Sequence, residues 1–122
     1  MPKDDQSDRH TIKYDANLNA FRQSMIVIVF SGMWLEETLY QAIVSRTGLD
    51  IGKKNDFKTY QDWLVRLDIF ETSLLDDVDA FMSTRAMLMH KTNVDSNEIL
   101  LAQTAADHAQ KIIGSISHVL GL

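Results

Sequence analysis

The longest apolar pattern in the chain lies between residues 15 and 46 and has the spacing of an α-helix. Its apolar residues recur every three or four positions, which places them on one face of a helix. These residues are Leu18, Phe21, Met25, Ile28, Leu35, Leu39 and Ala42. Asp15 or Asn17 can cap the start of this helix, and Gly48 can end it. We therefore expect a long first helix that runs to about Arg46.

A second apolar stripe lies on the same expected helix, on the opposite side. It consists of Ile26, Phe30, Met33, Tyr40 and Val44. A helix that is apolar on two sides must be covered on two sides. We therefore expect this helix either to lie at the centre of a bundle or to share one face with a second subunit.

Three shorter segments have the same helical period. The second helix is expected after a loop over residues 49–55, with Asp56 as its cap, and the third begins near Glu71. The fourth begins at Asp95, where Glu98 three residues later forms a capping-box-like pair. The residues expected to face the core are Phe57, Tyr60, Leu64 and Leu67, then Leu74, Leu75, Val78, Phe81 and Met82, and finally Leu101, Ala105, Ala109, Ile112, Ile116 and Leu120.

These patterns predict an all-α fold, a bundle of about four helices with a long first helix. No segment shows the strict alternation of apolar and polar residues that a half-buried strand requires. Only one proline and five glycines interrupt the 122 residues. Residues 1–13 carry mixed charges and few apolar groups, which predicts a flexible N-terminal tail before a single domain over residues 14–122.

Composition narrows the compartment and the partners. The chain has no cysteine, which excludes disulfides, thiolate metal sites and cysteine nucleophiles and fits a reducing compartment. Met1–Ile12 is charged and polar, so no signal peptide is expected. The apolar stretch Ser24–Leu35 is shorter than the roughly 20 residues of a membrane span. We therefore expect a cytoplasmic protein without membrane association. Its net charge of −5 disfavours broad binding to duplex nucleic acid.

Arg85 is the residue of the third expected helix that does not fit its surroundings. Helical spacing places it in the apolar stripe formed by Leu74, Val78 and Phe81, and a buried charge without a partner is costly. Glu37 is the expected partner, because it interrupts the second apolar stripe of the first helix. On position alone, a purely structural ion pair is the simpler interpretation.

His90 follows Arg85 by five residues, near the end of the same helix. Successive helical residues turn by about 100°, so the two side chains do not share one ideal face. They can converge if the helix loosens at its end, or if symmetry brings a second copy of each. A histidine can move a proton near neutral pH and a guanidinium can hold a phosphate through two hydrogen bonds, so the pair suits phosphodiester chemistry.

The motif Arg85-Ala-Met-Leu-Met-His90 and the acidic Leu35-Glu36-Glu37 of the first helix carry a family resemblance. From about residue 17 onward the chain resembles the HEPN superfamily, whose ribonuclease members are helical domains with an arginine followed, after four to six residues, by a histidine. The resemblance implies a metal-independent site that two subunits form together. It implies that His90 assists attack by the RNA 2′-hydroxyl and that Arg85 binds the scissile phosphate. Glu36 or Glu37 is expected to support Arg85 across the helix interface.

Two functions are therefore expected. The first is a HEPN-like endoribonuclease or toxin-type protein, a homodimer that cleaves single-stranded RNA without metal or cofactor and is neutralised by an antitoxin or regulatory protein. The second is a noncatalytic regulatory or protein-interaction module of the same fold, which the acidic net charge and Ala86 favour. A third, magnesium-dependent nucleotide hydrolysis, would use Asp76, Asp77 and Asp79 with the acidic pair of the first helix. For this cluster, a solvated acidic face is the simpler interpretation.

Overall fold

The computed structural model describes the backbone of residues 5–52, 57–91 and 94–122, and the side chains from residue 18 onward within these ranges. This part of the chain forms four helices and contains no strand, which confirms the expected all-α class. The helices are α1 (Asp5–Thr47), α2 (Phe57–Leu67), α3 (Thr72–Met89) and α4 (Ser96–Leu120).

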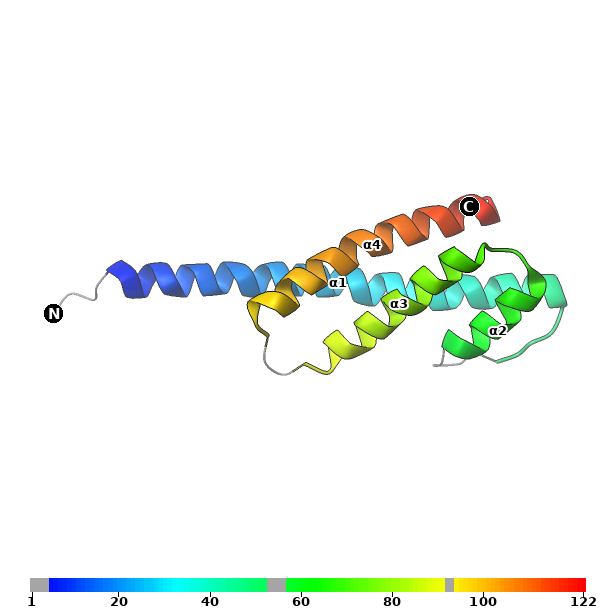
Figure 1. The fold of residues 1–122 in the computed structure, drawn as a ribbon, viewed down its shortest axis with the longest axis horizontal. Helices are drawn as coiled ribbons and strands as arrows, with labels where there is room; N and C mark the ends of the chain where they lie inside the picture. The colour runs from blue at the N-terminus through cyan, green and yellow to red at the C-terminus, as the bar shows by residue number, and fades with distance from the viewer. Residues whose placement is uncertain (1–4, 53–56, 92–93) are drawn as a thin grey trace.

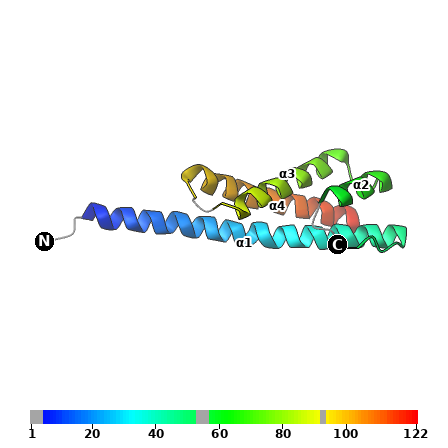
Figure 2. The same ribbon diagram turned by 90° about the horizontal axis from the view of Figure 1, so that it is seen from below.

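Figure 1 labels the four helices. Figure 2 shows that α2, α3 and α4 all lie on the same side of α1. α4 makes the most extensive contact with α1, and α2 and α3 also pack on it. The core is the apolar interior that the four helices enclose. It includes Ile28, Leu35, Leu39 and Ile43 of α1, Tyr60 and Leu64 of α2, Leu75, Val78 and Phe81 of α3, and Ala102, Ala109, Ile112 and Ile116 of α4.

The C-terminal end of α1 lies where the sequence pattern predicts it, but the N-terminal end does not. The helix ends at Thr47, where Gly48 adopts a left-handed conformation (φ 69°) and donates its N–H to the carbonyl of Val44 at 2.8 Å. It begins at Asp5, before the expected caps, so residues 5–13, which were expected in a flexible tail, have helical backbone. Adding a residue to an existing helix costs little, and residues 5–17 contain no proline or glycine that would stop it.

The start of α4 follows the predicted capping chemistry. The carboxylate of Asp95 accepts the backbone N–H of Glu98 at 2.9 Å, which confirms the cap at this position. The predicted cap of α2, Asp56, lies outside the described residues. The expected core residue Leu101 is 37% exposed, and its neighbour Ala102 is buried instead. Leu101 borders a cavity between α3 and α4 together with Ala80, Phe81 and Thr84, so its side chain lies at the edge of the core and stays partly exposed.

Tyr40 and Asp50 fasten the loop after α1 to the helix. The Tyr40 hydroxyl donates a hydrogen bond to the Asp50 carboxylate, and the N–H of Gly52 donates to the same oxygen at 2.9 Å. The bond from Tyr40, followed by the bond from Gly52, lowers the pKa of Asp50, because both favour the charged carboxylate. The same bond to Asp50 raises the pKa of Tyr40, because the phenol must keep its proton to donate it.

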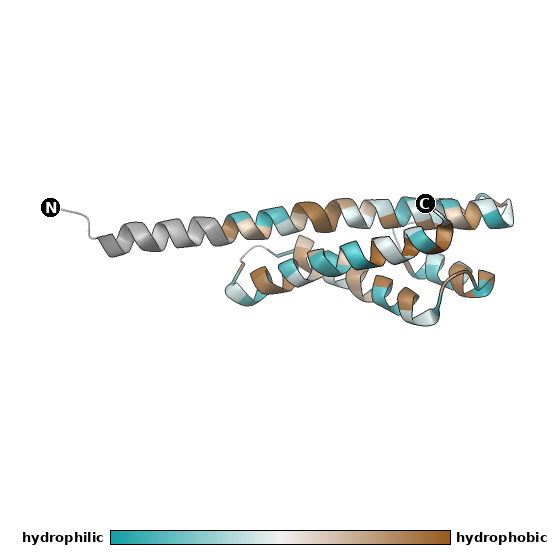
Figure 3. Ribbon diagram, turned by 90° about the horizontal axis from the view of Figure 1, so that it is seen from above, coloured by the Kyte–Doolittle hydropathy of each residue, from teal (hydrophilic) through white to brown (hydrophobic). Residues whose placement is uncertain are grey.

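The second apolar stripe of α1 faces outward over part of its length. Ile26, Phe30 and Met33 are 57%, 64% and 53% exposed, in the apolar middle of α1 (Figure 3). Tyr40 and Val44 are half-buried, and the Tyr40 ring lies 6.3 Å from that of Tyr60 in α2. The other helices of this chain therefore cover the stripe only towards the C-terminal end of α1. We call Ile26, Phe30 and Met33 the outer stripe.

By length and composition, the Leu18–Thr47 segment of α1 could cross a membrane. This segment is longer than the stretch Ser24–Leu35 considered above, and the absence of a membrane span stays a prediction. A core helix of a bundle passes the same test, and Ile28, Leu35 and Leu39 of this segment are fully buried in the core.

Replacing Asp95 by alanine should destabilise the fold by about 1 kcal/mol, because alanine cannot accept the N–H of Glu98. Urea unfolding of the purified chain measures the loss. Asp107→Ala is the matched control, since it removes the same charge from an exposed position inside α4. It should change stability by less than about 0.5 kcal/mol. Equal losses in the two variants would contradict the capping role.

Candidate functional site

Arg85 and Glu36 form an ion pair between α3 and α1. Nη1 of Arg85 lies 3.3 Å from Oε1 of Glu36, and the two side chains are 17% and 32% exposed. Glu37, the other expected partner, is exposed and accepts a hydrogen bond from Nε2 of Gln41 at 3.2 Å. Adjacent helical residues point about 100° apart, so only one of two neighbouring glutamates can turn toward α3. The structure therefore brings Glu36 to Arg85.

Gly32 makes room for the guanidinium of Arg85. A Cβ atom on Gly32 would lie 2.4 Å from Nε and 2.6 Å from Cδ of Arg85, far inside van der Waals contact. Gly32 precedes Glu36 by one helical turn, and together they form a seat for Arg85 on α1, which we call the Arg85 seat. Sequence reasoning missed Gly32. Its signal is a glycine inside a long helix, which costs about 1 kcal/mol relative to alanine and so needs a packing reason.

The Arg85 seat leaves part of the guanidinium unused. Nε is buried and has no hydrogen-bond partner in the described part of the chain. The pair with Glu36 joins one nitrogen to one carboxylate oxygen, whereas a guanidinium has five donor N–H groups suited to bidentate contacts. The side chain is therefore fixed in place and desolvated on one side, while its outer N–H groups keep hydrogen-bonding capacity for a ligand.

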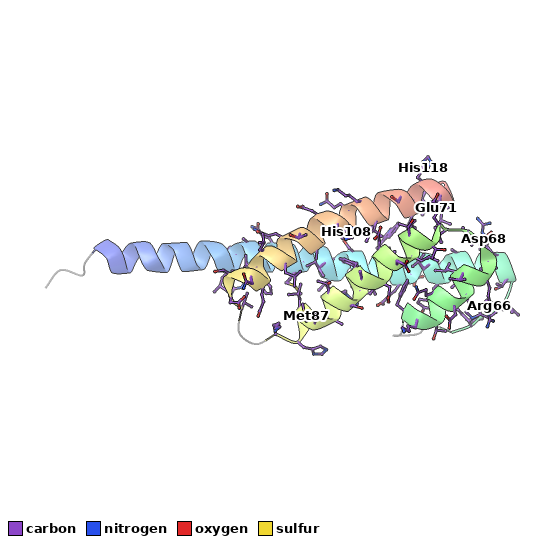
Figure 4. The ribbon with its side chains drawn as sticks, viewed as in Figure 1. Arg66, Asp68, Glu71, Met87, His108 and His118 are labelled. Carbon is purple, nitrogen blue, oxygen red and sulfur yellow. The ribbon has the colours of Figure 1, made fainter. Side chains whose placement is uncertain are left out.

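His90 lies at the end of α3 and is exposed. The backbone N–H of His90 donates to the carbonyl of Met87 at 3.3 Å, and the backbone N–H of Lys91 donates to the carbonyl of Leu88 at 3.3 Å. Bonds that reach back three residues tighten the last turn of the helix. Met87 is labelled at this end of α3 in Figure 4. Within the described residues of one chain, no hydrogen bond joins the side chains of Arg85 and His90.

Lys91, the residue after His90, forms an ion pair with α4. Nζ of Lys91 lies 3.5 Å from Oε1 of Glu98, whose backbone N–H is held by Asp95. The other carboxylate oxygen of Glu98 is buried and has no partner among the described residues. His90 is therefore followed directly by a lysine that is paired with α4.

The acidic cluster of α3 lacks the arrangement of a metal site. Asp76 and Asp77 are exposed and Asp79 is half-buried, while Glu36 is paired with Arg85. In the ranges that the structure describes, no group of three or more histidine, aspartate or glutamate side chains is placed to hold a metal ion. This arrangement agrees with a solvated acidic face.

Comparison of the chain with protein-family models, with curated proteins and with solved structures finds no match in any of the three. The function of the chain is therefore inferred from the chemistry of the Arg85 seat, of His90 and of the surfaces around them.

Gly32→Ala and Gly114→Ala make the same change in two helices and should have opposite effects. A Cβ on Gly114 of α4 meets no atom within 4 Å, so this variant should gain up to about 1 kcal/mol from better helix propensity. Gly32→Ala should lose stability, because the new methyl group displaces Arg85 from Glu36. Urea unfolding compares the two variants. Equal stabilisation by both would show that Arg85 does not rest on Gly32.

Glu36→Gln should destabilise the fold by about 1–3 kcal/mol, a loss between those of exposed and fully buried ion pairs. The substitution keeps the shape of the side chain but removes the charge that faces Arg85. Glu37→Gln keeps the acceptor for Gln41 and should change stability by less than about 0.5 kcal/mol. Thermal and urea unfolding of both variants measure the difference. Unchanged stability in Glu36→Gln would mean that the pair contributes nothing.

Proposed function

We propose that the chain is a HEPN-like, metal-independent endoribonuclease in which Arg85 and His90 act at an interface between two copies. The observation that carries the proposal is the Arg85 seat. The arginine of the motif lies between α1 and α3, is held by Glu36 and Gly32, and stays partly open to solvent. A guanidinium held in this way favours phosphate binding, because its orientation is already set when the ligand arrives.

The proposed partner is a second copy of the same chain. In one copy Arg85 faces α1, while His90 is exposed beyond the end of α3. A two-fold symmetric pair would bring His90 of one copy to Arg85 of the other. The outer stripe supports a second copy as the partner, because that copy would bury the exposed apolar side chains of α1. Met33 follows Gly32 in the sequence but points about 100° around the helix from it, so the stripe and the Arg85 seat lie on different faces of α1.

The proposed reaction uses the two residues in separate roles. The neutral imidazole of His90 takes the proton of the RNA 2′-hydroxyl, whose oxygen attacks the adjacent phosphorus. Arg85 neutralises the charge that develops on the phosphate oxygens. The bond from phosphorus to the 5′-oxygen breaks, the proton passes to that oxygen, and the products are a 2′,3′-cyclic phosphate and a 5′-hydroxyl end.

The second candidate is a noncatalytic regulatory module of the same fold. It is favoured by the pairing itself, since Arg85 already has a carboxylate partner and is largely buried. Ala86 beside it is exposed and offers no polar group. In this function Arg85 holds α3 on α1, and His90 has no chemical role.

His90→Ala should lower RNA cleavage by about 10²–10⁴-fold while leaving the fold intact, because the side chain is exposed and acts as the proton carrier. The assay uses single-stranded RNA of mixed sequence with a chelator, and it identifies the cyclic phosphate ends. His108→Gln replaces a histidine of α4, a different helix, and should retain full activity. Equal residual cleavage by wild type and His90→Ala would point to another site. Inactive wild type would favour the regulatory module.

Phe30→Glu should convert a dimer into monomers at micromolar concentration, because it places a charge in the outer stripe. Val65→Glu is the control, since Val65 of α2 is 55% exposed and lies outside the stripe. Sedimentation velocity measures both variants, and a monomeric wild type would contradict the dimer.

The same dimer makes a sharper test available. Mixed Arg85→Ala and His90→Ala chains should regain cleavage, since a heterodimer keeps one site with both residues intact. No recovery after subunit exchange would mean that the two residues do not act across the interface.

A further inference from the structure

A groove lies between the start of α3 and the end of α4. Its volume is about 850 Å³, within the roughly 300–1,000 Å³ typical of sites that bind ligands. It shares no residue with the Arg85 seat of α1, and Arg85 itself lies in the other half of α3. The groove therefore represents a feature that the proposed function does not use.

The two walls of the groove carry opposite charges. Glu71 and Asp77 lie on the α3 side, and Lys111 and His118 lie on the α4 side. Because the two helices run in opposite directions, Glu71 lies at the same end of the groove as His118 (Figure 4), and Asp77 lies toward the Lys111 end. All four residues are exposed.

None of these four side chains forms a hydrogen bond or ion pair in the described part of the chain. Glu71 is the N-cap of α3, yet its carboxylate makes no capping hydrogen bond to the helix. Two carboxylates, one ammonium group and one imidazole therefore line one groove without forming a direct pair with each other. Their hydrogen-bonding capacity is available to a ligand that carries both signs of charge.

The floor between the charged walls is apolar and open. Leu74 is half-buried and Val119 is 43% exposed, so both present apolar surface to the groove. Gly114 has no side chain, and a Cβ there would meet no atom within 4 Å. The floor can therefore accept an apolar side chain without displacing any part of the bundle.

We infer that this groove binds a short segment of a partner protein that carries an apolar side chain between a basic and an acidic one. The apolar side chain would lie on Leu74 and Val119, its basic neighbour against Glu71 and Asp77, and its acidic neighbour against Lys111. RNA does not fit this surface, because residues 68–79 hold five acidic residues and no basic one. The inference does not depend on ribonuclease activity, and a partner bound here would leave the Arg85 seat uncovered.

The test titrates the full, isotope-labelled chain with the blocked tripeptide acetyl-Lys-Leu-Glu-amide and follows backbone amide signals by NMR. We expect saturable shifts at Ser73, Gly114 and Ser115, with a dissociation constant in the millimolar range. The Lys-Leu-Lys, Glu-Leu-Glu and Lys-Ser-Glu peptides should each bind at least several-fold more weakly. Equal binding of all four peptides, or shifts confined to other regions, would overturn the inference.

Three variants make the test specific to the groove. Gly114→Leu fills the floor and should abolish binding, while urea unfolding checks that the bundle is intact. Lys111→Glu should weaken binding about tenfold, and the charge swap Asp77→Lys with Lys111→Asp should regain most of it. Binding that survives Gly114→Leu would overturn the inference. So would a change of oligomeric state in Gly114→Leu by sedimentation, because the occupant would then be a second copy of this chain.

Discussion

A guanidinium that lies between two helices constrains both of them. Arg85 of α3 rests on α1 at the one position where no side chain intervenes, and it is paired there with Glu36, one turn further along. Moving α3 along α1 by even a single turn would press the guanidinium against a side chain and would leave a desolvated charge without its partner. The register of α3 on α1 therefore depends on the Arg85 seat.

α1 has two different apolar surfaces, one that is buried within the fold and one that is exposed. Its inner face is completed within the chain, where Ile28, Leu35 and Leu39 are fully buried. Its outer stripe stays exposed, on a face of α1 about 100° around the helix from the Arg85 seat. The groove between the start of α3 and the end of α4 lies on a different part of the molecule. The proposed dimer would use the outer stripe and the proposed partner segment the groove, so neither would block the other.

Local signals in the sequence were sufficient for the helices and insufficient for the contacts between them. Gly48 and Asp95 act within one turn of their own position, so their roles as helix stop and cap could be predicted. The choice between Glu36 and Glu37 depends on how α1 is rotated against α3, which no local pattern specifies. Leu101 was misplaced for a related reason, because the rotation of α4 buries Ala102 and leaves Leu101 at the edge of the core. Gly32 is visible in the sequence, but its purpose appears only when Arg85 lies on it.

The close approach of Arg85 to Gly32 also has an evolutionary consequence. A larger residue at position 32 is unfavourable for as long as position 85 holds an arginine, because the new Cβ would push that side chain away from Glu36. Once position 85 carries a small residue, an alanine at position 32 fills vacated space and gains helix propensity. Substitutions at the two positions are therefore easier in one order than in the other. A lineage that gives up the arginine and then acquires the alanine would face a steric barrier to recovering it.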